Sequence, residues 1–156
     1  MSRQYGRKLT KEMLQDWGIV DIIYLPHINK WTFNEKTDWY IKRVWRKNSS
    51  KKFYEKRINV TEAVCKHKYT SDKKYLKITF SIDGKAISLP LSRVIYAWFI
   101  GPIDDREVID HIDNNPYNNY YKNLQKLSVG ENLAKRYLDN PQFNVNQHVV
   151  VKSNKQ

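Results

Sequence analysis

One short stretch, residues 108–119, decides how this chain folds and what it does. It reads VIDHIDNNPYNN and places Asp110 directly before His111. Val108 and Ile109 are typical of a β-strand, whereas the Asn- and Pro-rich residues that follow are typical of turns. A carboxylate and an imidazole are therefore expected where a strand runs into a loop.

Two asparagines follow this pair at defined distances. Asn123 lies twelve residues after His111, and Asn132 lies nine residues after Asn123. Leu124 and Leu127 between them predict a second short strand. The second strand would run back beside the first and bring Asn123 close to the loop.

A helix is predicted directly after the second strand. Ser128 with Glu131 three residues later is a capping-box pattern, which predicts a helix over residues 131–138. Asn132 would then lie in the first turn of that helix. A strand–loop–strand–helix arrangement of this kind can bring the four polar side chains to one point.

These residue types suit metal-assisted hydrolysis of a phosphodiester. A hard cation such as Mg²⁺ prefers oxygen ligands and keeps several waters, so the oxygens of Asp110 and Asn132 would suffice from the protein. A neutral imidazole such as that of His111 can accept the proton of an attacking water. A bound metal neutralises charge on the scissile phosphate and on the leaving oxygen.

Residues 92–138 resemble the HNH endonuclease motif, the ββα-metal nuclease site of many phage homing endonucleases. The resemblance covers roughly 45 of the 156 residues. It implies Asp110 as a metal ligand, His111 as the general base, and Asn123 as the residue that orients the histidine and its loop. It also implies Asn132 as the second metal ligand, at a position where the wider family often has His. That departure favours one Mg²⁺ or Mn²⁺ ion over zinc.

A plainer interpretation of the same residues is a surface turn. Asp-His pairs are common, and the four neighbouring asparagines are more simply turn formers than site residues; these are Asn114, Asn115, Asn118 and Asn119. Asp113 is expected to cap the loop. A surface turn, however, leaves the spacing of Asn123 and the capped start of the last helix without explanation.

The composition points to a polyanionic partner. Among 156 residues, 28 are Lys or Arg and 16 are Asp or Glu, which gives a net charge of +12. A generally adhesive basic protein is the less specific alternative. Since 40% of the residues are hydrophobic, the chain can form a core as one domain or as a small domain with an arm.

Cysteine content and hydropathy argue against disulfide-bonded, cysteine-zinc and membrane proteins. One cysteine, Cys65, excludes an internal disulfide and a cysteine zinc cluster and suits a reducing cytoplasm. There is no signal-peptide pattern and no apolar run near eighteen residues, so no membrane location is expected. The family resemblance implies a phage-encoded protein acting in the cytoplasm of its host.

Residues 46–57 are rich in basic side chains, with Phe53 and Tyr54 among them. This composition suits contact with a phosphate backbone, and it suits a solvated loop between strands equally well. The residues expected to contact DNA, here and elsewhere, are Arg43, Arg46, Lys47, Lys51, Lys52, Lys56, Arg57, Lys77, Lys135 and Arg136.

Other segments have predictable structure. We expect a helix over residues 11–17 capped by Thr10, strands over 19–25 and 39–45, and a helix that Ser92 caps and Gly101 ends. Asp83-Gly84 predicts a type I′ turn in a hairpin that pairs residues 76, 78 and 80 with 91, 89 and 87. Residues 59–69 could form a strand or a short helix, and the polar tail could form a strand or an arm that orders on DNA.

Together these features predict an α+β protein. Residues 1–90 would form a basic, mainly β DNA-binding region, residues 91–138 the catalytic module, and residues 139–156 a polar tail. The expected function is metal-dependent hydrolysis of double-stranded DNA, with a site-specific nickase of the phage homing type favoured and a monomer preferred. The competing function is that of a non-catalytic basic DNA- or RNA-binding protein with a vestigial site.

Overall fold

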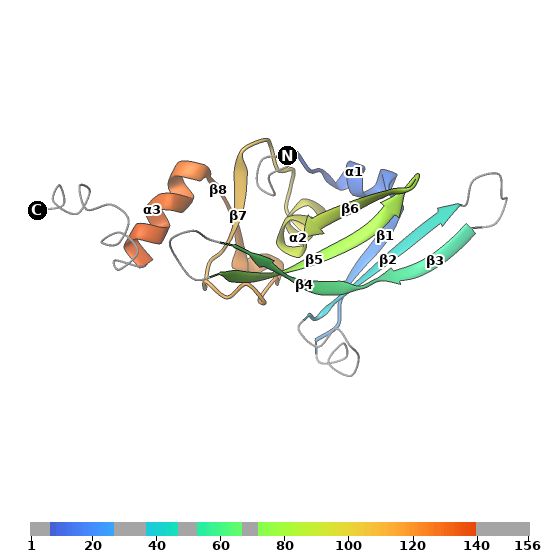
Figure 1. The fold of residues 1–156 in the computed structure, drawn as a ribbon, viewed down its shortest axis with the longest axis horizontal. Helices are drawn as coiled ribbons and strands as arrows, with labels where there is room; N and C mark the ends of the chain where they lie inside the picture. Colours follow the sequence, from blue (N-terminus) through green and yellow to red (C-terminus); the bar gives the residue numbers. More distant parts are fainter. Residues whose placement is uncertain (1–6, 27–36, 47–52, 67–71, 140–156) are drawn as a thin grey trace, which may run out of the picture.

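The computed structural model describes residues 7–26, 37–46, 53–66 and 72–139 of the chain (Figure 1). The elements, in chain order, are α1 (Lys11–Asp16), β1 (Ile19–Tyr24), β2 (Trp39–Arg46), β3 (Phe53–Ile58), β4 (Val60–Cys65), β5 (Lys73–Ile82), β6 (Lys85–Pro90), α2 (Leu91–Phe99), β7 (Glu107–His111), the 3₁₀ turn η2 (Tyr121–Asn123), β8 (Leu124–Ser128) and α3 (Val129–Asp139). The fold is therefore α+β and mainly β before α2, as the sequence predicts.

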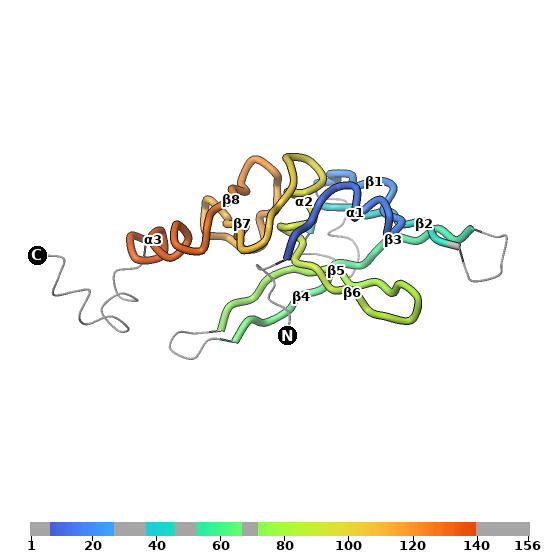
Figure 2. The backbone as a smooth tube through the Cα atoms, turned by 90° about the horizontal axis from the view of Figure 1, so that it is seen from above, coloured from blue at the N-terminus to red at the C-terminus, as the bar shows by residue number. Residues whose placement is uncertain are grey.

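The strands form three antiparallel sheets. β1, β2 and β3 make the first, β4, β5 and β6 the second, and β7 with β8 the third. The first sheet lies toward one end of the molecule and α3 at the other, which both views show (Figures 1 and 2). Helix α2 lies between them and contacts β5, β6, β7 and β8.

The core is continuous from the first sheet to the third. Ile41 of β2, Ile78 of β5 and Ile95 of α2 are fully buried, and Ile109 of β7 is 8% exposed. Arg93 of α2 is also buried and donates a hydrogen bond to the carbonyl oxygen of Glu107 at 2.9 Å. Burial lowers the pKa of this guanidinium. The start of β7 is thus attached to the central helix, two residues before the strand reaches its buried position.

The β5–β6 hairpin confirms the predicted register. Ile78 pairs with Leu89 and Phe80 pairs with Ile87. Asp83 and Gly84 have φ angles of 50° and 80°, as a type I′ turn requires at both central residues. The predicted pair of residues 76 and 91 is absent from this ladder, because the chain leaves the strand at Pro90 and α2 begins at Leu91.

The helix α1 and the strand β2 also agree with their sequence patterns. Thr10 Oγ1 accepts a hydrogen bond from the backbone nitrogen of Met13 at 3.2 Å, which caps α1. Trp39, Ile41 and Arg43 alternate along β2 and are all buried. The inward face of this strand therefore includes a charged residue, Arg43, which the sequence predicts to contact DNA.

Two predictions about the middle of the chain need correction or completion. Ser92 does not cap α2: it is buried inside the helix, and the cap position is held by Pro90 without a side-chain hydrogen bond. The helix starts earlier because it follows directly from the edge strand β6. Residues 59–69, left open between strand and helix, contain the strand β4.

The last three elements form the predicted ββα unit. Ser128 and Glu131 make both hydrogen bonds of a capping box: Ser128 N donates to Glu131 Oε1 at 2.8 Å, and Glu131 N donates to Ser128 Oγ at 3.1 Å. The helix they cap begins at Val129, two residues before the predicted start. No helix among the described residues is long and apolar enough to cross a membrane. The tail after Asp139 lies outside the described residues.

Candidate active site

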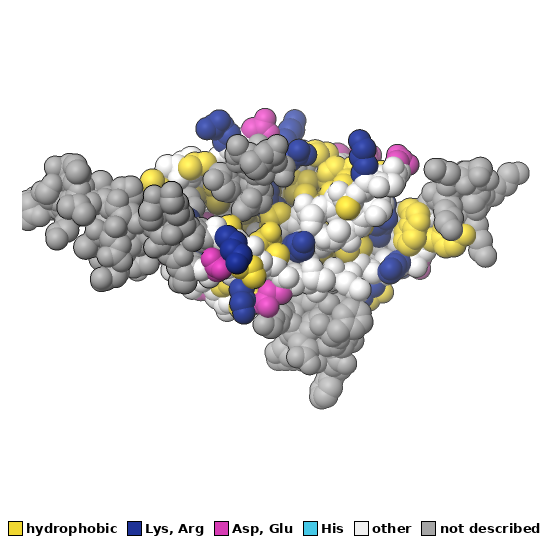
Figure 3. All heavy atoms as spheres, viewed as in Figure 1, with side chains coloured by type: hydrophobic (Ala, Val, Ile, Leu, Met, Phe, Trp, Pro, Cys, Tyr) yellow, Lys and Arg dark blue, Asp and Glu magenta, His cyan; other side chains and the backbone are white. Residues whose placement is uncertain are grey.

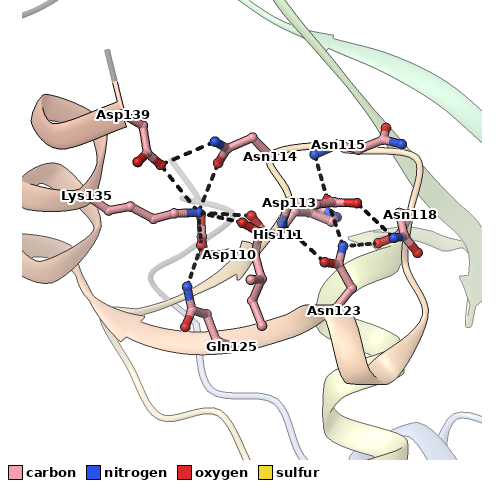
Figure 4. Close-up of polar contacts among 11 residues, drawn as sticks. Asp110, His111, Asp113, Asn114, Asn115, Asn118, Asn123, Gln125, Lys135 and Asp139 are labelled. Carbon is pink, nitrogen blue, oxygen red and sulfur yellow. Dashed lines mark hydrogen bonds and ion pairs between the residues drawn. The ribbon is translucent and has the colours of Figure 1, made fainter. Parts of the chain in front are cut away.

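Strand pairing places Asp110 and His111 at the end of β7. Asp110 pairs with Gln125 and His111 pairs with Leu124 on β8. Gln125 Nε2 donates a 2.8 Å hydrogen bond to Asp110 Oδ2 (Figure 4). The sheet therefore fixes the backbone of both residues, and the neighbouring strand orients the carboxylate.

Asn123 stabilises the loop that follows β7. Its Oδ1 accepts from the backbone nitrogen of Asp113 at 3.2 Å, and its Nδ2 donates to Asp113 Oδ1 at 2.9 Å and to the carbonyl oxygen of Asn118 at 2.8 Å (Figure 4). Burial opposes ionisation of Asp113, but hydrogen bonds from Asn118, from the Asn115 backbone and from Asn123 lower the pKa of this carboxyl group. Asp113 caps the loop, as predicted from its position.

The asparagines of this loop differ in what they do. Asn114 has a positive φ of 62°, and Asn115 Oδ1 accepts a hydrogen bond from the backbone nitrogen of Tyr117 at 3.0 Å. Asn118 Nδ2 donates to Asp113 Oδ2 at 2.9 Å. The backbone of Asn114 and the side chains of Asn115 and Asn118 thus form turns, as the sequence predicts. Asn119 does not follow that interpretation, because its side chain is buried and contacts the histidine.

The imidazole of His111 contacts Asn119. The Nε2 atom of His111 lies 2.8 Å from Asn119 Oδ1. Asn123, to which the family resemblance gave the task of orienting the histidine and its loop, contacts the loop at Asp113 and Asn118. The contact with the imidazole and the contacts with the loop thus come from two asparagines four residues apart.

Lys135 of α3 reaches across to the end of β7. Its Nζ lies 2.7 Å from Asp110 Oδ2, 3.0 Å from the carbonyl oxygen of His111 and 2.9 Å from Asn114 Oδ1. Asp139 Oδ2 lies 3.8 Å from the same nitrogen. One ammonium group is therefore surrounded by oxygen atoms, three of which belong to the loop and strand that hold the predicted metal ligand (Figure 4).

A cavity of about 500 Å³ opens at this place. Asp110, His111 and Asn132 all line it, so three of the four predicted site residues meet at one space. The described residues that line it do not include Asn123, whose contacts are with the loop. The remaining lining residues are Lys73, Lys74, Asn114, Pro116, Lys135, Arg136 and Asp139.

Lys73 and Lys74 are lining residues that sequence reasoning missed. They lie at the start of β5, far from the motif in the sequence, and both are exposed. Partial burial is the main cause that lowers the pKa of the Lys73 ammonium, and repulsion from the guanidinium of Arg136 is the second. The signal that could have found them is the basic run at the start of the predicted hairpin, although the run alone does not point to the cavity.

The donor atoms around the cavity fit a hard divalent cation. Asp110, Asn114 and Asn132 line it with carboxylate and amide side chains, and the His111 carbonyl lies among the same oxygens. Such ligands are those that Mg²⁺ and Mn²⁺ prefer. Among the described residues no group of three or more His, Cys, Asp and Glu side chains is arranged to hold a metal. The ammonium of Lys135 already lies among these oxygens, so this place accommodates positive charge.

The predicted DNA-contact residues are placed differently. Arg43 is 8% exposed, and its guanidinium donates to the carbonyl oxygens of Trp17 at 2.7 Å and Ser81 at 3.1 Å. It lies between the rings of Trp45 and Phe80, so it joins the first and second sheets and is not available to a phosphate. Lys56 is exposed on β3, whereas Lys77 and Arg57 are half-buried.

Some of the other predicted DNA-contact residues lie outside the described residues. Lys47, Lys51, Lys52 and the side chain of Arg46 lie outside the described residues, whereas Lys135 and Arg136 line the cavity. Figure 3 shows Lys and Arg side chains spread over one face of the molecule, with acidic side chains between them. Of the predicted DNA-contact residues, Lys135 and Arg136 are the two that line the cavity.

Comparison with known proteins agrees with this geometry. Residues 90–134 match a family model described as HNH endonuclease. This segment runs from the end of β6 through α2, β7 and β8 into α3 and includes all four predicted site residues. No curated protein and no solved structure matches the chain.

Proposed function

We propose that this chain, whose residues 90–134 match the HNH endonuclease family model, is a divalent-metal-dependent DNA endonuclease. The proposal includes hydrolysis of one strand of a duplex at a specific site, by a monomer, in the manner of phage homing enzymes. The single observation that supports it most is the shared cavity of Asp110, His111 and Asn132. That cavity combines a proton acceptor, hard oxygen ligands and cationic side chains.

In the proposed reaction His111 acts as the general base. The imidazole accepts a proton from a water molecule whose oxygen attacks the phosphorus atom. A new P–O bond forms with the water oxygen, the P–O bond to the leaving alcohol breaks, and the leaving oxygen takes a proton from solvent. Asp110 and Asn132 would hold the divalent ion, which when bound neutralises charge on the phosphate and on the leaving oxygen.

The lysines of the cavity hold the substrate in this scheme. Lys73 and Lys74 lie on its β5 side, and Arg136 lies on its α3 side. A phosphodiester between them would be contacted by cations from two directions, which fixes its position relative to His111. Contacts of this kind provide affinity independent of sequence, so selection of a specific site requires further contacts from other parts of the chain.

A single site per chain supports the prediction of a nick. The sequence contains one such Asp-His…Asn…Asn arrangement. The two strands of a duplex have opposite polarity, so one site in a monomer hydrolyses one strand per binding event. A double-strand break would need a symmetric dimer or a second, reoriented binding event.

One observation favours the alternative, a DNA-binding protein with a vestigial site. Lys135 Nζ forms a 2.7 Å ion pair with Asp110, the residue that should hold the metal. If that pair persisted in the DNA complex, the carboxylate would be neutralised and no hydrolysis would follow. The chain would then bind nucleic acid through its basic side chains without cutting it.

A cleavage assay separates these functions. Supercoiled plasmid, linear duplex, single strands and RNA are each incubated with the protein in EDTA, Mg²⁺, Mn²⁺ or Zn²⁺. The proposed function predicts open-circular plasmid with Mg²⁺ or Mn²⁺, linear plasmid appearing late, and no product in EDTA. Simultaneous appearance of linear DNA from a two-chain complex would replace the nicking monomer by a dimer. Cleavage that persists in EDTA would contradict the metal dependence.

Two variants assign the activity to the site. We expect His111→Ala to lose about 10²–10⁴ in rate and to keep its affinity for duplex DNA, because phosphate contacts lie elsewhere. Asp110→Asn should lose cleavage together with metal binding. Lys85→Ala, at the exposed turn end of β6, is the matched control and should cleave normally. Wild-type protein that binds DNA and never cuts it would establish the vestigial alternative.

A further inference from the structure

We propose that Asn119 is a positioning residue for His111. It fixes the imidazole in the tautomer with the proton on Nε2, and this leaves Nδ1 as the atom that accepts the proton of the attacking water. The role of Nδ1 as proton acceptor rests on the proposed function. The tautomer of the imidazole does not, and it can be measured without cleavage.

The orientation of the Asn119 amide follows from its two contacts. Its Nδ2 lies 3.2 Å from the carbonyl oxygen of Pro116, and its Oδ1 lies 2.8 Å from His111 Nε2. A carbonyl oxygen can accept a hydrogen bond and cannot donate one, so the amide nitrogen must face Pro116. The reversed amide would bring two oxygen atoms together at the proline. The Asn119 oxygen therefore faces the histidine.

The tautomer of His111 follows from the amide. Since Asn119 Oδ1 only accepts, Nε2 of the imidazole must donate and must bear the proton. In the neutral ring the other nitrogen, Nδ1, then has a free electron pair. A histidine that acts as a base needs an unprotonated ring nitrogen. The hydrogen bond to Asn119 determines that this nitrogen is Nδ1.

Burial strengthens this assignment. Asn119 is 4% exposed, whereas the other asparagines of the loop are exposed or half-buried. A buried amide is costly unless its polar atoms are paired, and here both ends of the side chain are. Water competes little for the Asn119–His111 contact, so the hydrogen bond persists in one geometry.

The first sheet fixes the backbone of Asn119. The indole Nε1 of Trp39, on β2, donates a 3.0 Å hydrogen bond to the Asn119 carbonyl oxygen. Trp39 is 2% exposed, and its ring packs against Tyr24, Phe99 and Tyr120 with centroid distances of 5.0, 5.2 and 6.4 Å. Trp39 of the first sheet thus fixes the backbone of Asn119, and the side chain of Asn119 contacts the imidazole of His111.

The placement of His111 between two cavities is consistent with the proposed roles of its nitrogens. Asn119 and His111 line an apolar cavity of about 160 Å³, and His111 also lines the 500 Å³ cavity with Asp110 and Asn132. Asn119 lines the first of these cavities and Asp110 the second. The protonated Nε2 faces Asn119, so Nδ1 is the nitrogen left for a water molecule in the larger cavity.

Nitrogen NMR of the full chain tests the tautomer directly. Imidazole ¹⁵N spectra are recorded at increasing pH until the signals no longer change, so that the ring is neutral, and His111→Gln identifies the His111 signals among those of the four histidines. We expect a protonated Nε2 whose hydrogen exchanges slowly with solvent, and an unprotonated Nδ1. An unprotonated Nε2 in the folded wild-type protein would overturn the proposal.

Matched variants test the role of Asn119. Asn119→Ala should lose the slowly exchanging hydrogen. Asn119→Asp keeps an acceptor for Nε2 but turns a second oxygen toward the Pro116 carbonyl oxygen, so it should retain part of the protection. Asn115→Ala, in the same loop, removes a turn contact and should leave the His111 signals unchanged. Trp39→Phe keeps an aromatic ring but removes the indole N–H donor. It should accelerate exchange of the His111 Nε2 hydrogen with solvent. Circular dichroism verifies that each variant is folded, and a folded Asn119→Ala with an unchanged slow hydrogen would contradict the proposal.

Kinetics connect the tautomer with the reaction. Partners of site residues typically contribute about 10–100-fold, so Asn119→Ala should lose about that factor in kcat with little change in KM, and Asn119→Asp should recover part of it. If His111→Ala cleaves normally while the NMR result holds, the proposed base is wrong and the positioning by Asn119 stands. If Asn119→Ala changes the tautomer without changing kcat, the link to catalysis is refuted.

Discussion

The Nζ atom of Lys135 lies 2.7 Å from Asp110 Oδ2 and, at 3.0 Å, also contacts the carbonyl oxygen of His111. The same nitrogen is 2.9 Å from Asn114 Oδ1. The lysine therefore occupies a set of oxygens that suits a cation, one helical turn after the predicted ligand Asn132. An incoming divalent ion has to compete with this ammonium group.

Removal of that ammonium should strengthen metal binding in the absence of DNA. Two like unit charges about 4 Å apart repel by about 1 kcal/mol in water and about 4 kcal/mol near a protein surface, so we expect Lys135→Met to bind Mn²⁺ at least about fivefold more tightly. Calorimetric titration of the DNA-free protein measures this. Lys122→Met, which removes an exposed lysine of η2, is the charge-matched control. Weaker Mn²⁺ binding by Lys135→Met would mean that the lysine organises the ligands and does not compete with the metal.

Lys73 and Lys74 should contribute to DNA affinity through phosphate contacts. Replacing both by Ser should weaken binding to all duplex sequences. It should also reduce the slope of log affinity against log salt by about 0.9 for each lost contact. Fluorescence anisotropy over a range of salt concentrations measures the slope. The double variant Lys85→Ser with Lys122→Ser removes the same charge at exposed positions outside the cavity and should leave the slope nearly unchanged.

Lys56 and Arg57 provide a separate test of the basic run. Phosphate contact and a solvated position were equally compatible with the sequence, and the two residues lie on β3 of the first sheet. If the first sheet contacts DNA, Lys56→Ser, an exposed position, reduces the salt slope as well. An unchanged slope in this variant would assign the described part of the run to solvent and leave DNA contact to the cavity.

Arg43 should stabilise the fold and contribute nothing direct to binding. Its guanidinium joins the carbonyl oxygens of Trp17 and Ser81, and Lys cannot make both contacts with the same geometry. Hydrogen bonds to charged groups contribute about 1.5–3 kcal/mol each, so Arg43→Lys should lower the free energy of unfolding by about that amount. Urea titration measures the loss. A stable Arg43→Lys variant with a reduced salt slope would instead place this arginine on DNA.

The Asp113 carboxylate should make the site loop sensitive to acid. Its pKa in the folded protein lies below the ordinary value of 3.8, so its contribution to stability is complete above that value and disappears as the pH falls through the folded value. We expect wild-type unfolding to gain an acid-dependent component below about pH 4. Asp113→Asn should lack that component. Thermal unfolding of both proteins between pH 2 and 6 provides the comparison, and parallel curves would exclude the loop as its source.

Local patterns were sufficient to predict much of the fold. The Asp83-Gly84 turn determined its hairpin because both residues tolerate positive φ. The Ser128–Glu131 box located the start of α3 to within two residues because both partners lie within one turn. In each case the interacting atoms are close in sequence, so residue type and spacing contain the required information.

The contacts that were missed join residues far apart in sequence. Asn119 has the same residue type and the same loop as the turn-forming asparagines, and its burial depends on Trp39, which is 80 residues earlier in the chain. The position of Lys73 at the cavity depends on how α2 packs against both β5 and β7. Ser92 was assigned as a cap from residue type, although the chain turns into α2 directly from an edge strand.

The hydrogen bond between the Trp39 indole and the Asn119 carbonyl limits how the segment that matches the HNH endonuclease model could be exchanged between proteins. Residues 90–134 contain Asp110, His111 and Asn132, but the group that satisfies the Asn119 carbonyl comes from β2. A chimaera that joined this segment to a different N-terminal half would leave a buried oxygen without its donor. Recombination that preserves this contact would therefore have to transfer β2 together with the loop, so the segment that must be exchanged as one unit is larger than the motif.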